Sequence, residues 1–383
     1  MRKFFQELLD FFRKGDMVLL ALCLLTTIFG VVILSSVTNY SNTHRFVIVQ
    51  LVATVLGIFL YAVISSIDLD LIMEYRLPLV IFNVAFLMLL IPFGVDYDSG
   101  NRSWLDIPGL PFDIQVAEIL KTTYILITAS VMAAHQNRLS KFRSVMHMVF
   151  HLGLPVGLNM VLSKDAGVSL IFVFIFIGMT FAGGVHKGWF IAAISCLAAG
   201  FPVLWSILRP HQKNRFLVLF DPSVDPTATG IRWHSNQAML SLTGGGFTGQ
   251  GLYSGRRTSV GALHAQHTDY IFSAIGEELG FIGCMAVIIL EFAVIARIIY
   301  VGIRTPDFAR RVVCFGAASA LIFQVTINIG MNLGVLPVIG LTLPFISYGG
   351  SSMLSLYAML GLVSGVCARP TPGKQGLYVQ PPR

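Results

Sequence analysis

Long apolar runs follow one another along nearly the whole chain. A helix needs about 20 apolar residues to cross the hydrocarbon core of a bilayer, and most of these runs have that length. The pattern therefore predicts an all-α polytopic membrane protein with about ten transmembrane helices. The ten runs lie near 17–37, 46–66, 77–93, 117–134, 146–163, 167–184, 188–208, 270–299, 308–331 and 351–369.

The segments outside these runs differ in length and in character. Two of the connecting segments are long, at about 94–116 and 209–268. Residues 1–16 alternate apolar pairs with charged side chains, which is typical of an amphipathic helix at a membrane surface. Residues 370–383 are rich in Pro and Gly and have no apolar periodicity, so we expect a short disordered tail. The transmembrane domain is then expected over 17–369.

Composition and charge support a membrane protein and set its orientation. Charged residues make up 12% of the chain, about half the share typical of soluble domains. A net charge of +7 could indicate nucleic-acid binding, but Lys and Arg gather in alternate connecting segments, as in the cytoplasmic loops of membrane proteins. We therefore expect no nucleic-acid partner. Both termini are expected in the cytoplasm, and the two long segments outside.

Ionisable residues in or beside an apolar run are costly to bury, so they indicate a partner or a polar cavity. Glu118 and Lys121 lie three residues apart on one helix face and can form an ion pair. This pair either joins two helices or forms a wall of a cavity that accepts phosphate. Asp165 precedes a predicted helix, where it can cap the N-terminus, belong to a site, or do both.

The segment HAQHTDY, at 264–270, leads into the eighth run from its outer side. Asp269, next to His267, is placed there either as a helix cap or as a general base at the membrane–water boundary. The same outer segment contains Arg215, whose guanidinium matches phosphate oxygens unless it is merely solvated. The run TGGGFTGQG, at 243–251, is either a hinge or a backbone cradle for an anionic head group.

The stretch at 334–352 interrupts two apolar runs with Pro337, Pro344 and the Gly349–Gly350 pair. These residues prevent a regular helix. Irregular backbone at membrane depth is tolerated only within protein or beside a cavity. This stretch is therefore the clearest indication of a site that the pattern alone provides.

Several of these segments together resemble the SEDS family of cell-wall polymerases, which includes RodA, FtsW and SpoVE. NIGMNLGVLPVIGLTLPFISYGGSS, at 328–352, and QHTDYIFSAIGEELGFIG, at 266–283, are similar to its signature segments. The resemblance implies ten transmembrane helices with a large extracellular segment between the seventh and eighth. It also implies a peptidoglycan glycosyltransferase that polymerises lipid II into glycan strands.

The resemblance also assigns roles to particular residues. It implies that Asp269 is the essential acid. The other positions it matches, or that lie in the matched motifs, are expected to bind substrate: Trp104, Glu118, Lys121, Asp165, Arg215, Gln237, His267, Thr268, Ser347, Gly349 and Ser351. The chain departs from the family pattern beside some of these positions, for example at Val116, Ala117 and Lys164.

The expected enzyme acts at the outer face of a bacterial cytoplasmic membrane, in elongation, division or sporulation. Its expected partners are lipid II, membrane lipids and a class B penicillin-binding protein that acts as transpeptidase. The leaving diphosphate is stabilised either by Lys121 and Arg215 or by a divalent cation such as Mg²⁺ or Mn²⁺. Two alternatives stay open, a flippase for lipid-linked precursor and a non-catalytic scaffold for a transpeptidase. The sequence shows no inverted repeat of broken helices, the pattern that usually indicates a transporter, so the flippase has no such support.

Overall fold

The computed structural model describes residues 15–41, 43–95, 101–107, 109, 112–207, 210–221, 223 and 231–368. Nearly all of the amphipathic helix predicted over 1–16, and the whole tail predicted over 370–383, lie outside these residues.

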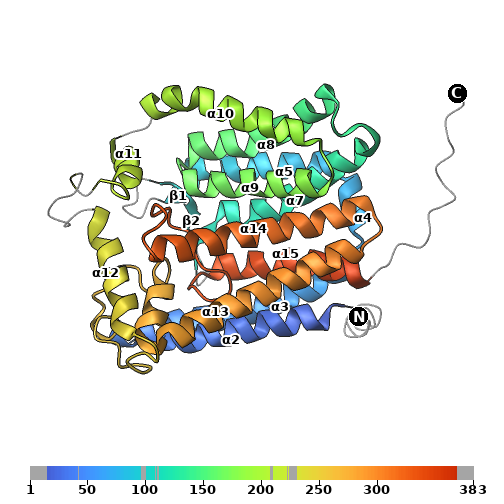
Figure 1. Cartoon of the computed structure of the whole chain (residues 1–383). Helices are drawn as coiled ribbons and strands as arrows, with labels where there is room; N and C mark the ends of the chain where they lie inside the picture. The colour runs from blue at the N-terminus through green and yellow to red at the C-terminus, as the bar shows by residue number, and fades with distance from the viewer. Residues whose placement is uncertain are drawn as a thin grey trace, which may run out of the picture.

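Helices laid side by side form the body of the molecule (Figure 1). Eight are long and apolar enough to cross a membrane, and α9 and α10 are two further apolar helices. Each of the ten predicted runs thus corresponds to a helix, the third being divided into α5 and α6, which confirms the predicted all-α membrane fold. The helices are α2 (Met17–Val37), α3 (Arg45–Ser66), α5 (Arg76–Met88), α6 (Leu90–Phe93), α7 (Val116–Ala134), α8 (Phe142–Leu162), α9 (Ala166–Ala182), α10 (Lys187–Ile207), α13 (Ile271–Arg304), α14 (Phe308–Asn332) and α15 (Gly350–Ala368).

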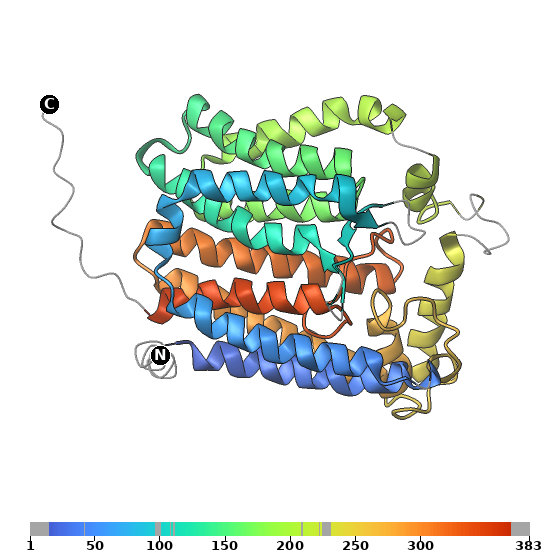
Figure 2. The same ribbon diagram turned by 180° about the vertical axis from the view of Figure 1, so that it is seen from behind.

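The two long connecting segments lie at one end of this bundle, which we call the loop end (Figures 1 and 2). The opposite end, where α2 begins and α15 ends, is called the terminal end. The loop end also holds a small antiparallel sheet of order β1-β2-β3, which the apolar pattern did not predict. The elements there are η1 (Asn39–Ser41), β1 (Gly94–Val95), β2 (Trp104–Leu105), β3 (Ile114–Gln115), α11 (Pro210–Leu217), α12 (Ile231–Gly245) and η4 (Thr258–Val260); α4 (Leu69–Glu74) and η2 (Gln136–Arg138) lie at the terminal end.

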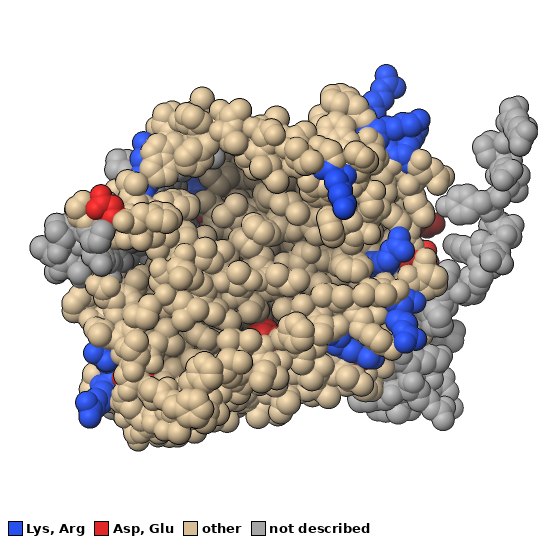
Figure 3. Space-filling view, in the orientation of Figure 1, with Lys and Arg blue, Asp and Glu red and all other residues tan. Residues whose placement is uncertain are grey.

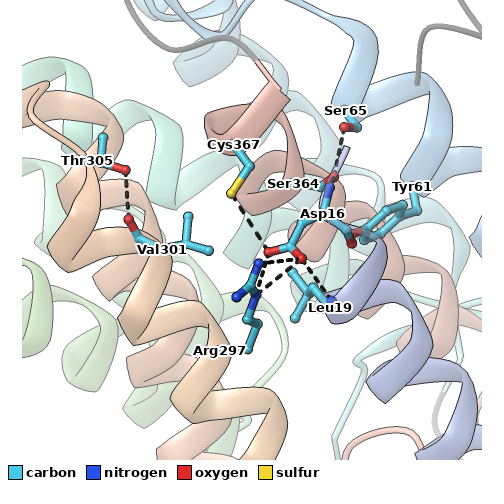
Figure 4. Close-up of polar contacts among 9 residues, drawn as sticks. All are labelled: Asp16, Leu19, Tyr61, Ser65, Arg297, Val301, Thr305, Ser364 and Cys367. Carbon is cyan, nitrogen blue, oxygen red and sulfur yellow. Dashed lines mark hydrogen bonds and ion pairs between the residues drawn. The ribbon is translucent and has the colours of Figure 1, made fainter. Parts of the chain in front are cut away.

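An ion pair ties the beginning of α2 to α13 at the terminal end (Figure 4). Arg297 donates from Nε and Nη2 to the carboxylate of Asp16 over 2.9–3.2 Å, and this carboxylate also caps α2 through the Leu19 N–H. The Asp16 N–H donates to Ser364 Oγ of α15, and Tyr61 of α3 donates to the Asp16 carbonyl. Four helices are therefore fixed to one another through a single residue.

The helix α10 has much looser packing than the others. Ile191, Ile194 and Leu197 along its length are 66%, 66% and 67% exposed. At the terminal end, Ser140 holds the start of α10. Its backbone carbonyl accepts from Trp189 Nε1, and its Oγ accepts from the His186 N–H. A space-filling view shows the surface hollowed beneath α10 (Figure 3). Most of α10 therefore faces the surroundings rather than the core.

Candidate functional site

The half-buried Asp269 lies at the loop end, two residues before α13. Its backbone carbonyl accepts from Nδ2 of Asn328 at 3.1 Å and from Nδ2 of Asn332 at 2.9 Å. Both asparagines belong to α14 and have no exposed surface. Asn332 Oδ1 in turn accepts from the N–H and the Oγ of Ser273. Two buried amides therefore fix the backbone of Asp269 against α14.

The two residues before Asp269 are held by the stretch that leads into α15. His267 O accepts from the Tyr348 N–H at 2.8 Å, and Thr268 O accepts from Ser347 Oγ at 2.6 Å. The buried Gln50 of α3 also binds this stretch, because its Nε2 donates to Ser347 O. Its Oε1 also accepts from the N–H of the predicted site residue Gly349. All three carbonyls of the His-Thr-Asp sequence are thus hydrogen-bonded to donors distant in the chain.

The stretch between α14 and α15 has the irregular backbone that was predicted. Gly334 and Gly340 have positive φ values of 68° and 76°, which glycine adopts without steric cost. A Cβ placed on Gly340 would lie 3.5 Å from Oδ2 of Asp269. The carboxylate of Asp269 therefore lies directly beside this stretch, where a side chain at position 340 would approach it.

Asp165 approaches the same stretch from the side of α9. Its Oδ1 accepts from the Val168 N–H at 3.1 Å, which confirms the predicted helix cap, and its Oδ2 accepts from Ser103 Oγ at 3.2 Å. Gly167, in the first turn of α9, packs so closely on Ile339 that an added Cβ would lie 2.3 Å from Ile339 Cγ2. Asp165 and Asp269 thus belong to segments that contact the neighbouring residues 339 and 340.

The small sheet connects Trp104 to the start of α7. Trp104 pairs with Gln115 across β2 and β3, and the Gln115 N–H donates to Ser351 Oγ in the first turn of α15. The Val116 N–H donates to Ser103 O. Trp104 and Ser351, both predicted site residues, therefore flank one strand at the loop end.

Glu118 and Lys121 form the predicted ion pair, with Nζ and Oε2 2.6 Å apart. Glu118 is 5% exposed and Lys121 is 1% exposed. Lys121 Nζ also donates to Gln324 Oε1 of α14 at 3.3 Å, and Ser355 Oγ of α15 donates to Glu118 O. The pair therefore joins α7 to α14 and α15, which agrees with the first of the two predicted roles.

The glycine run at 243–251 packs against a break in α13. Gly280 has φ 65° and ψ −159° inside this helix, so nearby backbone groups lose their helical partners. The Gln250 N–H donates to Glu277 O, and the Phe281 N–H donates to Gly246 O, both over 2.9 Å. The glycines thus allow two backbones to approach each other and satisfy the groups that the break exposes.

Two buried glutamates beside this break hold the loop above it. Glu277 accepts from the N–H groups of Arg257 and Thr258, over 2.9 Å and 3.0 Å. Glu278 Oε1 accepts from Thr258 Oγ1 and from Ser36 Oγ of α2. Neither glutamate was assigned a role from the sequence, although two adjacent acids in an apolar run are an unusual pattern. Their hydrogen bonds hold the loop at residues 257–258 against α13, and Glu278 also joins it to α2.

Two predicted substrate-binding residues lie on the helices of the large loop. Arg215 belongs to α11, and its side chain lies outside the described residues. Gln237 is half-buried on α12, which packs along α13. In Figures 1 and 2, α11 lies apart from the start of α13. Gln237 therefore lies on a helix beside α13, and only the backbone of Arg215 is placed, on α11.

Burial disfavours the charged form of two histidines at the loop end. His267 packs on the rings of Phe46 and Tyr348, with centroids 4.7 Å and 5.8 Å apart. Burial lowers the pKa of His267, and the nearby His264 lowers it further. Burial and His264 also lower the pKa of His234 on α12.

The side chains in the described part of the chain do not form a metal site by themselves. No group of three or more His, Cys, Asp or Glu is arranged there to hold an ion. The predicted Mg²⁺ or Mn²⁺ therefore finds no complete set of protein ligands among the described residues.

Fold and site together define a polytopic helical membrane protein with an aspartate whose backbone is held at one end of the helix bundle. The model of the FtsW, RodA and SpoVE family, described as cell cycle proteins, matches residues 16–370. The chain belongs to this family.

Individual relatives match over most of their length. The probable peptidoglycan glycosyltransferase FtsW of Trichlorobacter lovleyi is 32% identical, over 94% of this chain and 96% of the relative. The peptidoglycan glycosyltransferase MrdB of Escherichia coli is 30% identical, over 75% of this chain and 76% of the relative.

Solved structures share the fold. A chain from a peptidoglycan synthase complex that coordinates polymerization and crosslinking has a TM-score of 0.80 and 28% identity, covering 94% of this chain and 99% of that chain. A mutant of the rod shape determining protein RodA from Thermus thermophilus has a TM-score of 0.69 and 25% identity, with coverage of 93% and 98%.

Proposed function

We propose that this protein is a peptidoglycan glycosyltransferase that polymerises lipid II, with Asp269 as the catalytic base. The observation that carries the proposal is the double amide clamp on the backbone carbonyl of Asp269, which holds the backbone of this half-buried residue at the loop end. The membership of the chain in the FtsW, RodA and SpoVE family supports the same activity.

In the proposed reaction, Asp269 acts as the base in the transfer of a glycosyl group. A sugar hydroxyl of the acceptor attacks the anomeric carbon of the donor, forming a new C–O bond while the bond to the diphosphate breaks. The Asp269 carboxylate accepts the hydroxyl proton during this attack. Undecaprenyl diphosphate leaves with the electron pair. The fixed backbone holds the base in position, so little reorganisation is needed at the moment of reaction.

The distribution of charge supports an outer location for the loop end. Charged side chains are few across the middle of the face shown in Figure 3, and most of the basic ones gather towards the terminal end. Lys and Arg are enriched on the cytoplasmic side of membrane proteins. We therefore place both termini in the cytoplasm and Asp269 at the outer face. Basic residues in the helices and turns of the terminal end are Arg76, Arg138, Lys141, Arg143, Lys187, Arg297, Arg304, Arg310 and Arg311.

Two further parts of the proposal concern substrate entry and a partner. The exposed length of α10 and the hollow beneath it offer a lateral route for the polyprenyl tails. A class B penicillin-binding protein is the proposed partner, because a solved chain that shares this fold belongs to a peptidoglycan synthase complex that coordinates polymerization and crosslinking. Trp104, Asp165, His267 and Ser351 are the proposed substrate-binding residues at the loop end.

The test is polymerisation of lipid II by the purified full chain, alone and with its transpeptidase. We expect Asp269→Asn to lower the rate at least about 100-fold, since a positioned base contributes that much or more. The matched control is Asp307→Asn, which alters the acid that caps α14 at the terminal end. Equal rates for Asp269→Asn and the parent would refute the role of Asp269. Lipid flipping without polymer would favour the flippase, and partner binding without either activity would favour the scaffold.

A further inference from the structure

The proposed reaction releases a diphosphate, and the negative charge that develops on it requires a cation near Asp269. Of the two cations predicted for this role, Lys121 is 1% exposed and paired with Glu118 in the core of the bundle. The side chain of Arg215 lies outside the described residues. Since Lys121 is buried in its ion pair, a different cation at the loop end is needed for this role.

Arg45 is a cation in a suitable position. It is the first residue of the membrane-spanning helix α3, which begins at the loop end. It therefore lies at the membrane–water boundary, where the phosphates of lipids also lie. Its side chain is exposed. In the part of the chain that the structure describes, its backbone N–H bonds Thr43 Oγ1, and its guanidinium has neither an ion pair nor a hydrogen bond.

Three aromatic rings connect Arg45 to the segment that contains Asp269. Phe46, the next residue of α3, packs on the rings of His267 and Tyr348, with centroids 4.7 Å and 5.0 Å apart. The Tyr348 N–H donates to His267 O at 2.8 Å, and His267 lies two residues before Asp269. The start of α3 is therefore packed directly against the segment of the proposed base.

The phenol of Tyr348 lies within electrostatic reach of Arg45. Burial raises the pKa of Tyr348, the Arg45 guanidinium opposes this rise, and the Asp113 carboxylate adds to it by a smaller amount than Arg45 removes. Together, the two charged side chains therefore produce a positive potential at the phenol, which favours an anion. The phenolic hydroxyl is also a hydrogen-bond donor that suits a phosphate oxygen.

We propose that Arg45 and Tyr348 bind the diphosphate that leaves in the glycosyl transfer. This proposal rests on the proposed function and names residues that contact its substrate. The guanidinium donates to two phosphate oxygens, a geometry that arginine provides and lysine does not. The Tyr348 hydroxyl donates to a third. As the C–O bond to the diphosphate breaks, its electron pair stays on the diphosphate, and Arg45 stabilises the added charge.

The experiment measures undecaprenyl diphosphate retained in native mass spectrometry by the purified full chain carrying Asp269→Asn, so that no polymerisation interferes. We expect Arg45→Gln to lower retention about 10-fold, the factor for one hydrogen bond to a charged group. Arg45→Lys is expected to lower it less, because a charge remains. Tyr348→Phe, which keeps the ring, is expected to lower it about threefold. An equal concentration of phosphatidylglycerol is expected not to displace the diphosphate, since a single phosphate offers Arg45 and Tyr348 fewer oxygens.

The matched control is Arg256→Gln, which removes an exposed arginine of the large loop whose backbone N–H bonds Gln250. It is expected to retain the diphosphate as the parent does. Parent-like retention in Arg45→Gln, an equal loss in Arg256→Gln, or displacement by phosphatidylglycerol would overturn the proposal.

Steady-state kinetics with Asp269 intact then distinguish the leaving diphosphate from the diphosphate of the acceptor lipid. We expect Arg45→Gln to lower the kcat of lipid II polymerisation about 10-fold with little change in KM, because the charge develops during the reaction. A rise in KM alone would overturn the assignment to the leaving group. Retention is measured without turnover, so it can fail while polymerisation stands, and polymerisation can fail while retention stands.

Discussion

At the scale of single residues, the candidate base depends on groups that never touch a substrate. Asn328 and Asn332 bind the carbonyl of Asp269 rather than its carboxylate. They therefore set where the side chain of Asp269 starts. Their fully buried position on α14 suits this role, because side chains in a packed core have little freedom to move.

Replacement of Asn332 tests this positioning. We expect Asn332→Ala to lower the kcat of lipid II polymerisation about 10-fold to 100-fold with little change in KM, since one or two buried hydrogen bonds that align the base are lost. The steady-state kinetics of the purified protein measure both constants. Ser319→Ala is the control, because it removes a hydrogen bond to Phe315 O elsewhere on α14. A rise in KM alone would show that Asn332 serves substrate binding instead.

At the scale of elements, α13 is divided by Gly280. The break would leave backbone groups unsatisfied within a membrane helix, and the glycine loop at 245–251 supplies their partners. Loop and helix are therefore one structural unit, although about 30 residues separate them in the chain.

Substitution of Gly280 tests this unit. Its φ of 65° with ψ of −159° is accessible only to glycine, and an added Cβ would lie 2.4 Å from Gly249 N. We expect Gly280→Ala to destabilise the fold by at least about 2 kcal/mol. Thermal unfolding of the purified protein measures this loss. Gly153→Ala on α8, where a Cβ meets nothing within 4 Å, is expected to leave the melting temperature unchanged or raise it.

The ten helices could be predicted from the sequence because bilayer thickness fixes the length of an apolar run. The break at Gly280 could not, since it lies inside a continuous apolar run and its compensating loop is distant. The three strands are two residues long, too short for any periodicity. The position of Asp269 before α13 was predicted from its motif, whereas its asparagine clamp was not, because hydrogen bonds between distant segments leave no local pattern.

At the scale of the whole molecule, two half-buried histidines at the loop end make stability depend on pH. His267 and His234 have lowered pKa values in the folded protein, mainly through burial and secondly through His264. The unfolded chain has histidines with pKa near 6.5, so it binds protons first as pH falls. Stability is then fully present above about pH 6.5 and decreases as pH falls towards the folded pKa values.

Thermal unfolding between about pH 7.5 and 5.5 measures this dependence. We expect the melting temperature to fall on the acid side, and His267→Asn to weaken the fall. His186→Asn is the control, since His186 is exposed at the terminal end. A melting temperature that rises on acidification would contradict the lowered pKa values of these imidazoles.

The ion pair between Asp16 and Arg297 has a consequence for how the protein is made. The two residues are 281 positions apart, so at about 5–20 residues per second the ribosome reaches Arg297 some 15–60 s after Asp16. During that interval the start of α2 lacks its ion-pair partner, while Tyr61 of α3 has already been made and can bond the Asp16 carbonyl. The start of α2 therefore gains its full set of contacts only after residues of the eighth and tenth spans, Arg297 and Ser364, have been made.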